Sequence, residues 1–440
     1  MGNEVVADCE FAAFVGIDWA EQKHVLALQD RQTGRIEIGE IEHTPEAVDA
    51  WAMELSQRYQ ERPIAVALEQ VRGSLVFMLT KYKHLVIFPI HPATLANYRK
   101  SFRPSGAKGD PHDAGLLLDL LTRHREKLRR INPDIAETRT LRFLVEERRK
   151  LVNERIRFSQ RLNSHLKLYF PQVLNWFCDI GSQIAEHFLE RWPTLEALQK
   201  AKTKTLERFF TDHNSRSPDK IKTRLEEIRR AVTATHDSAV ITASSAAALA
   251  LVRILRELRN AISSYDSQIE KLAQAHPDFV IFDSFPGAGA AMAPRLIAAF
   301  GTCRDRYRTA HEIQCYSGIA PVVESSGKQH WVHYRWSCPK FLRQTFHEWA
   351  LHSMASSAWA KNYYKEQRAK GKSHHSAVRA LAFKWIRILF RCWQDRKPYN
   401  PALYENARQS RSREPKACTS PVNIEWKTRS GFSKLSRADS

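Results

Sequence analysis

Short apolar runs and polar turns alternate along the first ninety residues, which predicts β-strands with helices between the later ones. The first three runs are AAFVGID, HVLALQD and RIEIGEIE, with short turns between them. Strands are expected at 12–18, 24–30, 35–42, 63–69 and 85–91, and helices at 45–60 and near 74–83. Three successive strands followed by alternating helices and strands indicate a mixed α/β sheet.

The spacing of apolar residues becomes helical farther along the chain. A basic segment from Thr140 to Phe170 carries an apolar stripe, and residues 247–274 place apolar side chains in steps of four and three, as heptads do. Such helices pack on each other or on a second protomer, so an intramolecular hairpin and a dimerising coiled coil both stay open. Residues 171–220, which lie between them, are expected to be an irregular insertion.

The remaining third of the chain predicts a mainly helical region that begins with a glycine-rich turn. The turn Pro286-Gly287-Ala288-Gly289 precedes a helix, as in helix-hairpin-helix modules, where glycine exposes backbone N–H groups to a phosphate. The domain boundaries expected from these changes are 1–130, 131–275 and 276–395, followed by a basic tail, 396–440, expected to be disordered or to contact RNA.

Charge is distributed unevenly along the 440 residues. The net charge is +20, yet residues 1–100 hold ten Lys and Arg against fourteen Asp and Glu, a local charge of −4, so the other 340 residues carry +24. A basic surplus of this size raises the local concentration of polyanions and steers nucleic acid to the protein. The charge therefore favours a nucleic-acid-binding protein.

Other features of the composition bear on compartment. Seven cysteines are scattered without a C-x-x-C pair, which fits reduced thiols better than disulfides or a structural zinc site. No apolar run is expected to reach the ~20 residues that span a bilayer. A cytoplasmic protein without a membrane contact is therefore expected.

Four acidic residues in the first domain are placed as in a metal-dependent nuclease. Asp18 ends the first predicted strand, Glu69 ends the fourth, and Asp110 and Asp113 lie three apart at the start of a helix. The order of elements is that of the ribonuclease H-like fold, in which those strands are neighbours. Converging carboxylates repel one another unless cations lie between them, and Mg²⁺ or Mn²⁺ is the natural occupant. The alternative is a turn residue at Asp18, an N-cap at Asp110 and a favourable first-turn acid at Asp113.

Several motifs together resemble one family. GIDWAEQKH, VALEQ, ANYRKSFRPSGAKGDPHDA, FPGAG, YSGIAPVVESSGK and the block from Phe341 through Trp393 occur in the order found in transposases of the insertion-sequence 110 family. These are DEDD transposases with a RuvC-like N-terminal domain, a coiled-coil middle and a C-terminal transposase domain. The similarity covers about residues 12–395.

This resemblance implies a particular chemistry and a set of partners. Asp18, Glu69, Asp110 and Asp113 would hold Mg²⁺, and Ser326, or alternatively Ser325, would attack DNA to form a transient phosphoserine. The family implies recombination at DNA element ends and targets, guidance by an element-encoded bridge RNA, and homodimers that pair into tetramers. The sequence alone does not exclude a RuvC-like junction resolvase or nuclease that uses water, a sugar-kinase or actin-like ATPase, or a non-catalytic RNA-binding protein.

Overall fold

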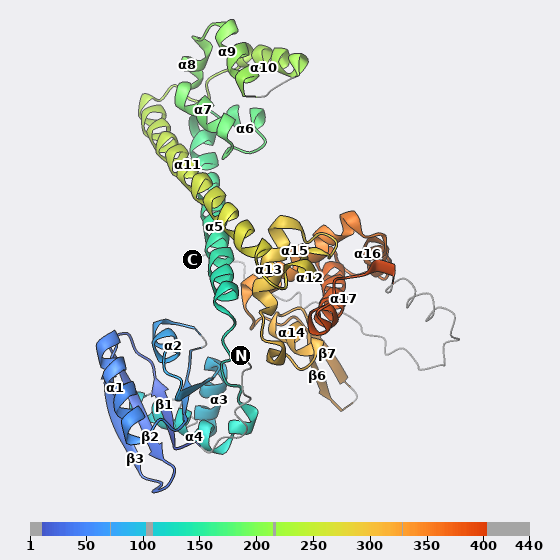
Figure 1. Cartoon of the computed structure of the whole chain (residues 1–440). Coiled ribbons are helices and arrows are strands. Elements are labelled where there is room, and N and C mark those ends of the chain that lie inside the picture. The colour runs from blue at the N-terminus through green and yellow to red at the C-terminus, as the bar shows by residue number, and fades with distance from the viewer. Residues whose placement is uncertain (1–10, 71, 103–108, 214–216, 328, 403–440) are drawn as a thin grey trace, which may run out of the picture. The chain divides into compact units, whose positions relative to one another are not determined.

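The computed structural model describes residues 11–70, 72–102, 109–213, 217–327 and 329–402 and divides into two compact units, 1–133 and 134–440 (Figure 1). The first unit is a mixed α/β domain and the second is mostly helical. From residue 403 onward, the basic tail expected at 396–440 lies outside the described residues.

The first unit is built on a five-stranded sheet whose strand order is β3-β2-β1-β4-β5. Antiparallel pairs join β1 to β2 and β2 to β3, whereas β4 runs parallel to both β1 and β5. The predicted meander and the alternating elements after it are both present. The strands are β1 (Ala13–Asp18), β2 (Lys23–Asp30), β3 (Ile36–Glu42), β4 (Ile64–Leu68) and β5 (Leu85–Pro89).

Helices cover the two faces of this sheet. Val15 of β1 and Val66 of β4 pack with Leu55 of α1 and Leu79 of α2 on one face. On the other face, Ala65 and Ala67 of β4 pack with residues of α3 and α4. All five residues of β4 are buried because the strand has helices on both sides. The helices are α1 (Pro45–Arg58), α2 (Ser74–Leu79), α3 (Pro92–Phe102) and α4 (Asp110–Arg123), followed by the 3-10 turn η1 (Arg125–Lys127).

Gly16 sets how closely α4 approaches β1. A Cβ atom at this position would lie 2.2 Å from the carbonyl oxygen of Ala114 and 2.6 Å from the amide nitrogen of Leu118. These atoms belong to the backbone of α4 and cannot rotate away, so only glycine fits here. The contact fixes the start of α4 beside the strand that ends in Asp18.

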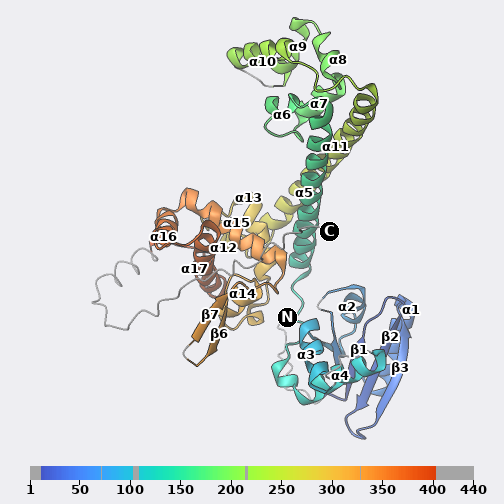
Figure 2. The same ribbon diagram turned by 180° about the vertical axis from the view of Figure 1, so that it is seen from behind.

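Two long helices form a hairpin in the second unit. Helices α5 (Ala136–Tyr169) and α11 (Ser238–Gln274) lie side by side in both views (Figures 1 and 2). Arg148 on α5 forms an ion pair with Asp266 on α11. Of the two packings that the apolar seams left open, the intramolecular one is present.

The segment expected to be irregular, 171–220, is mostly helical where the structure describes it. Aromatic side chains such as Trp176, Phe188 and Phe210 form a core with Leu166 of α5 and Leu251 of α11. The expectation of irregular structure was wrong, because a helical pattern is present: Leu206, Phe209 and Phe210 of α9 follow helical spacing and are buried. They are α6 (Val173–Trp176), α7 (Gln183–Arg191), α8 (Leu195–Gln199), α9 (Thr203–Asp212) and α10 (Pro218–Arg230).

The other end of the hairpin belongs to a second core. Leu141 of α5 and Ile269 of α11 pack there with Trp349, Trp385 and Trp393 of the C-terminal helices. These elements are α12 (Phe279–Asp283), α13 (Gly289–Phe300), η2 (Arg304–Arg306), α14 (Ala310–Tyr316), β6 (Val322–Ser326), β7 (Gln329–His333), α15 (Lys340–Ser356), α16 (Ala358–Ala369) and α17 (His374–Asp395).

Asp134 anchors the chain just before α5. Its carboxylate accepts hydrogen bonds from Arg142 and from the backbone N–H of Thr302, and it lies 2.7 Å from Arg306 Nη2. Burial alone would raise the pKa of Asp134, but the two guanidinium groups outweigh burial and hold that pKa below its usual value. The ionised carboxylate therefore joins the start of α5 to the loop after α13.

Helix α11 is longer and more apolar than the sequence analysis allowed. By length and composition it could cross a membrane, contrary to the expectation that no run was long enough, since Ala, Ser and Thr dilute the Leu and Val of its first half. Leu251, Val252 and Leu255 are buried in the core formed with α6 to α10. Only 28% of the apolar stretch is buried, so packing against α6 to α10 accounts for part of this apolar surface.

Candidate active site

Asp18 and Glu69 lie at the same edge of the sheet. Asp18 is the last residue of β1, and Glu69 directly follows β4. The two strands are parallel neighbours with Ile17 opposite Leu68, so the two acids are the next residues in register. Both are half-buried. The predicted convergence of these two carboxylates at one edge therefore has a structural basis.

Helix α4 brings Asp113 to the interior of the same unit, where it meets an arginine. Arg99 on α3 donates from Nε to Oδ1 of Asp113 and from Nη2 to Oδ2, both over 2.7 Å. Each side chain is only 8% exposed. A bidentate, buried pair of this kind is strong and geometrically specific. Both carboxylate oxygens of Asp113 are therefore bound to Arg99.

Asp110 begins α4 but does not cap it. The N-cap residue is Gly109, and Asp110 is the first helical residue, followed by Pro111. The alternative of an N-cap at Asp110 is therefore wrong by one position. The side chain of Asp110 lies outside the described residues.

The predicted metal site is only partly assembled in the described part of the chain. No group of three or more His, Cys, Asp or Glu side chains among those described is arranged to hold a metal ion. Both oxygens of Asp113 bind Arg99, and the side chain of Asp110 is not among those described. The roles assigned to the four acids stay predictions.

Two histidines that the sequence analysis did not single out support the chain after Asp18. The backbone N–H of Ala20 donates to Nδ1 of buried His24 over 3.2 Å. Nε2 of His24 therefore carries the proton and donates to Nδ1 of His43 over 2.8 Å, and His43 Nε2 lies 2.9 Å from Ser74 Oγ. Burial, and then the neighbouring His43, lower the pKa of His24 to about 4. A neutral His24 thus holds the turn that follows Asp18.

The two candidate serines lie in the second unit, on a small hairpin. Strands β6 and β7 pair antiparallel with Ser325 opposite His330 and Ser326 opposite Gln329. Gly327 adopts a φ of +57° in the turn, a conformation that glycine tolerates. Both serines are exposed. The predicted polar turn is therefore the end of a β-hairpin that presents Ser326 to solvent.

The glycine-rich turn at 286–289 joins α12 to α13, and packing explains its first glycine. Gly287 has a φ of +71°, and a Cβ there would lie 2.6 Å from backbone atoms of His352 and Ser353 in α15. Trp349 Nε1 donates to the carbonyl oxygen of Pro286 over 3.1 Å. The turn is thus held against α15, and the expected phosphate contact stays a prediction.

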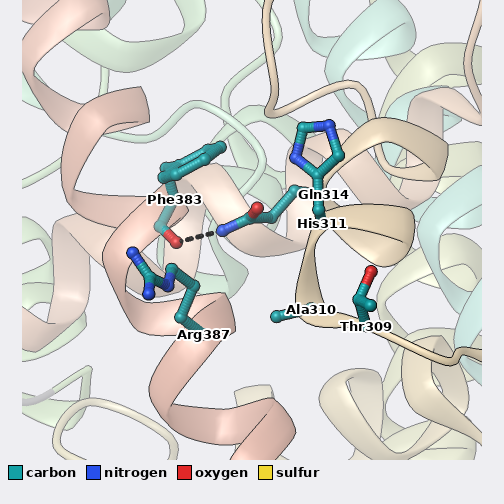
Figure 3. Close-up of a pocket in the computed structure, with 6 residues that line it drawn as sticks. All are labelled: Thr309, Ala310, His311, Gln314, Phe383 and Arg387. Carbon is teal, nitrogen blue, oxygen red and sulfur yellow. Dashed lines mark hydrogen bonds between the residues drawn. The ribbon is translucent and has the colours of Figure 1, made fainter.

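A hollow in the second unit is lined by none of the predicted site residues. It has a volume of about 350 Å³ and is bordered by α14 and α17 (Figure 3). Gln314 Nε2 donates to the carbonyl oxygen of Phe383 over 2.7 Å and joins the two helices. The lining residues are Thr309, Ala310, His311, Gln314, Phe383 and Arg387.

Known proteins resemble both units. A transposase model of the IS110 DEDD type matches residues 15–171, and the model described as the IS116/IS110/IS902 transposase family matches 280–365. The chain named as the mini-circle transposase of IS117 in Streptomyces coelicolor is 28% identical over 88% of this chain and 95% of its own length. The 43.6 kDa protein of insertion element IS110 from the same organism is 29% identical over 66% of this chain and 72% of its own length. The 42 kDa protein of IS900 from Mycobacterium paratuberculosis is 28% identical over 69% of this chain and 75% of its own length.

These matches follow the order of the two units. The four acids fall inside the first matched segment, and both candidate serines fall inside the second. Together the two segments extend over more than half of the chain. The similarity to the IS117 protein also spans the helices that separate them. The chain therefore belongs to the IS110 family of insertion-sequence transposases.

Proposed function

We propose that this transposase cuts and rejoins DNA in a reaction that depends on a divalent cation and moves an insertion sequence. The observation that carries the proposal is the pairing of Asp18 and Glu69 on neighbouring parallel strand ends. Both acids lie in the segment that the DEDD transposase model matches. The strand order, with three antiparallel strands followed by two parallel ones, supports a ribonuclease H-like, RuvC-like fold.

Asp18, Glu69, Asp110 and Asp113 are the residues proposed to hold Mg²⁺ or Mn²⁺. The carboxylates of the half-buried residues Asp18 and Glu69 supply oxygen ligands of the kind that a hard cation prefers. Asp113 would join them only when Arg99 releases its carboxylate, because both oxygens accept hydrogen bonds from that guanidinium. A bound cation would neutralise charge that develops on the phosphate oxygens during strand cleavage.

Ser326 is the proposed nucleophile. Its hydroxyl loses a proton to a base and its Oγ forms a bond to phosphorus, while the phosphorus–oxygen bond to one DNA strand end breaks and that oxygen gains a proton. Attack by a free hydroxyl of another strand on the phosphoserine then restores Ser326 and joins the strands. The exposure of Ser326 at the end of a hairpin supports this role.

Replacing Ser326 by alanine is expected to remove the covalent protein–DNA adduct. Denaturing gel electrophoresis of a reaction with end-labelled DNA would reveal the adduct in the native chain. Ser325→Ala, one residue away on the same strand, is the matched control and should keep the adduct. An adduct in Ser326→Ala but not in Ser325→Ala would move the nucleophile to Ser325. Cleavage without any adduct in the native chain would instead favour a nuclease or resolvase that uses water.

We further propose that an element-encoded bridge RNA guides the enzyme, which works in the cytoplasm as dimers that pair into tetramers. Half-buried and exposed apolar residues in the middle of the α5–α11 hairpin, such as Ile156 at 49% exposure, support contact with a second copy. RNA that copurifies with the chain is expected to be enriched in one element-encoded species. Sequencing that RNA and weighing the complex by light scattering would test both points; random RNA bound to a monomer would contradict them.

A further inference from the structure

The segment after the β6–β7 hairpin displays a nearly bare tryptophan. Trp336 is 79% exposed, although hydrogen bonds of the preceding residue, Arg335, hold the backbone there in place. Arg335 donates from Nε to the carbonyl oxygen of Ala320 over 3.3 Å, and Arg343 Nη1 donates to the carbonyl oxygen of Arg335 over 3.2 Å. A large apolar ring held outward on a fixed backbone suits contact with a flat ligand.

Cationic side chains surround the aromatic neighbour of Trp336. The Tyr334 ring lies 4.8 Å from the Trp336 ring, with an angle of 72° between their planes. The guanidinium carbons of Arg343 and Arg379 lie 4.9 and 4.5 Å from the centre of the Tyr334 ring. An aromatic pair beside two guanidinium groups is a combination that recognises a base together with its phosphate.

The same surface continues along α17. Arg379, Phe383 and Arg387 are spaced four residues apart, so they follow one face of the helix over about 12 Å. Arg379 and Arg387 form no hydrogen bond or ion pair with any residue that the structure describes, whereas Arg391 lies 3.7 Å from Asp395. Phe383 and Arg387 also border the hollow beside His311 (Figure 3). Two unpaired guanidiniums therefore follow the aromatic pair.

Charge favours a polyanion as the occupant of this surface. Residues 275–402 contain nineteen Lys and Arg against eight Asp and Glu, a surplus of +11. The helical insertion at 171–237 contains eleven against ten, a surplus of only +1. Residues 275–402, which include α17, therefore carry more than half of the net charge of the chain.

We propose that Trp336, Tyr334 and the α17 face of Arg379, Phe383 and Arg387 bind single-stranded nucleic acid. An unpaired base stacks on Trp336, and the guanidiniums of Arg379 and Arg387 contact the phosphates that follow. Base stacking needs an open π-face that a paired base in a duplex does not offer, so the surface selects unpaired over paired strands. This inference rests on the proposed function only in taking nucleic acid as the ligand.

Binding of fluorescent oligonucleotides to the full-length chain tests the inference. Fluorescence anisotropy would be measured with a single-stranded DNA, the same sequence as RNA and the matching DNA duplex, all in EDTA so that cleavage plays no part. Trp336→Ala is expected to weaken single-strand binding roughly tenfold or more and duplex binding less than threefold. Trp336→Phe, which keeps an aromatic face, should restore most of the loss. Whichever single strand, DNA or RNA, binds with the higher affinity identifies the nucleic acid that this surface prefers.

Arginine variants complete the test. Arg379→Ala and Arg387→Ala should each weaken single-strand binding at least threefold and flatten its salt dependence. Arg391→Ala, on the same helix but paired with Asp395, is the matched control and should change binding less than twofold. Equal losses for single strands and duplexes, or no loss in Trp336→Ala, would overturn the inference. Because no cleavage is measured, either failure would leave the proposed strand-transfer chemistry untouched.

Discussion

The variant Asp18→Asn is expected to cleave DNA at least ~10³-fold more slowly than the native chain while binding DNA with an affinity within about twofold. The substitution keeps the shape of the side chain but removes the negative charge at the end of β1 that would help to hold a divalent cation. Binding should survive because the basic surplus lies in the rest of the chain. Single-turnover cleavage and anisotropy, measured with Mg²⁺ and with Mn²⁺, would give both quantities.

A second carboxylate of the same unit provides the control for Asp18. Asp49 lies on the exposed surface of α1, where it accepts a hydrogen bond from Tyr82. Asp49→Asn should cleave DNA at the native rate within about twofold, since it removes a solvated charge. Native-like cleavage by Asp18→Asn would exclude a catalytic metal role for that residue.

Replacing Arg99 by methionine is expected to destabilise the first unit by about 3–5 kcal/mol, because the buried carboxylate of Asp113 loses its partner. Hydrogen exchange of the α4 amides in the full-length chain would measure the effect as a loss of protection of roughly 10²- to 10⁴-fold. Arg123→Met is the matched control, since its ion pair with Asp119 is exposed on the arginine side. The control should change protection by less than about 1 kcal/mol.

The double variant Arg99→Met/Asp113→Leu separates a structural role of Asp113 from a catalytic one. An apolar pair of similar volume should recover most of the lost protection, as replaced buried ion pairs commonly do. Restored protection without DNA cleavage would support a cation-binding role for Asp113. Restored protection with native cleavage would show that Asp113 only holds α4 against α3. Native protection in Arg99→Met alone would contradict a stabilising role of the Arg99–Asp113 pair.

Much of the first unit could be predicted because its signals are local. Short apolar runs between polar turns predict the strands, and Asp18 and Glu69 occupy the strand ends that the parallel register makes adjacent. Arg99 was missed because its partner lies fourteen residues away on another helix. One signal was available: Arg99 follows Leu95 by four residues, so the buried face of α3 includes a cation that needs a buried anion.

The supporting histidines and the tertiary packing of the second unit were harder to predict. His24 and His43 are nineteen residues apart, and only the pairing of β2 with β3 places His24 opposite Ile41 and therefore near His43. The heptad seams of α5 and α11 predict an apolar stripe without specifying its partner. The longer helices at 173–230 do carry helical spacing, as in Leu206 and Phe209 of α9, but the sequence does not show that these apolar faces meet in one aromatic core.

The division of the α5–α11 hairpin between two cores has a consequence for how the chain folds during synthesis. The core around α6 to α10 uses residues from Leu162 to Leu255, whereas the other core needs residues from Leu141 to Tyr399. During synthesis, all residues of the core around α6 to α10 therefore leave the ribosome long before the last residues of the other core. Forming the core around α6 to α10 draws the distal ends of α5 and α11 together, which shortens the loop that the later core must close and reduces its entropic cost. We therefore expect the insertion to nucleate the hairpin and the C-terminal helices to assemble last.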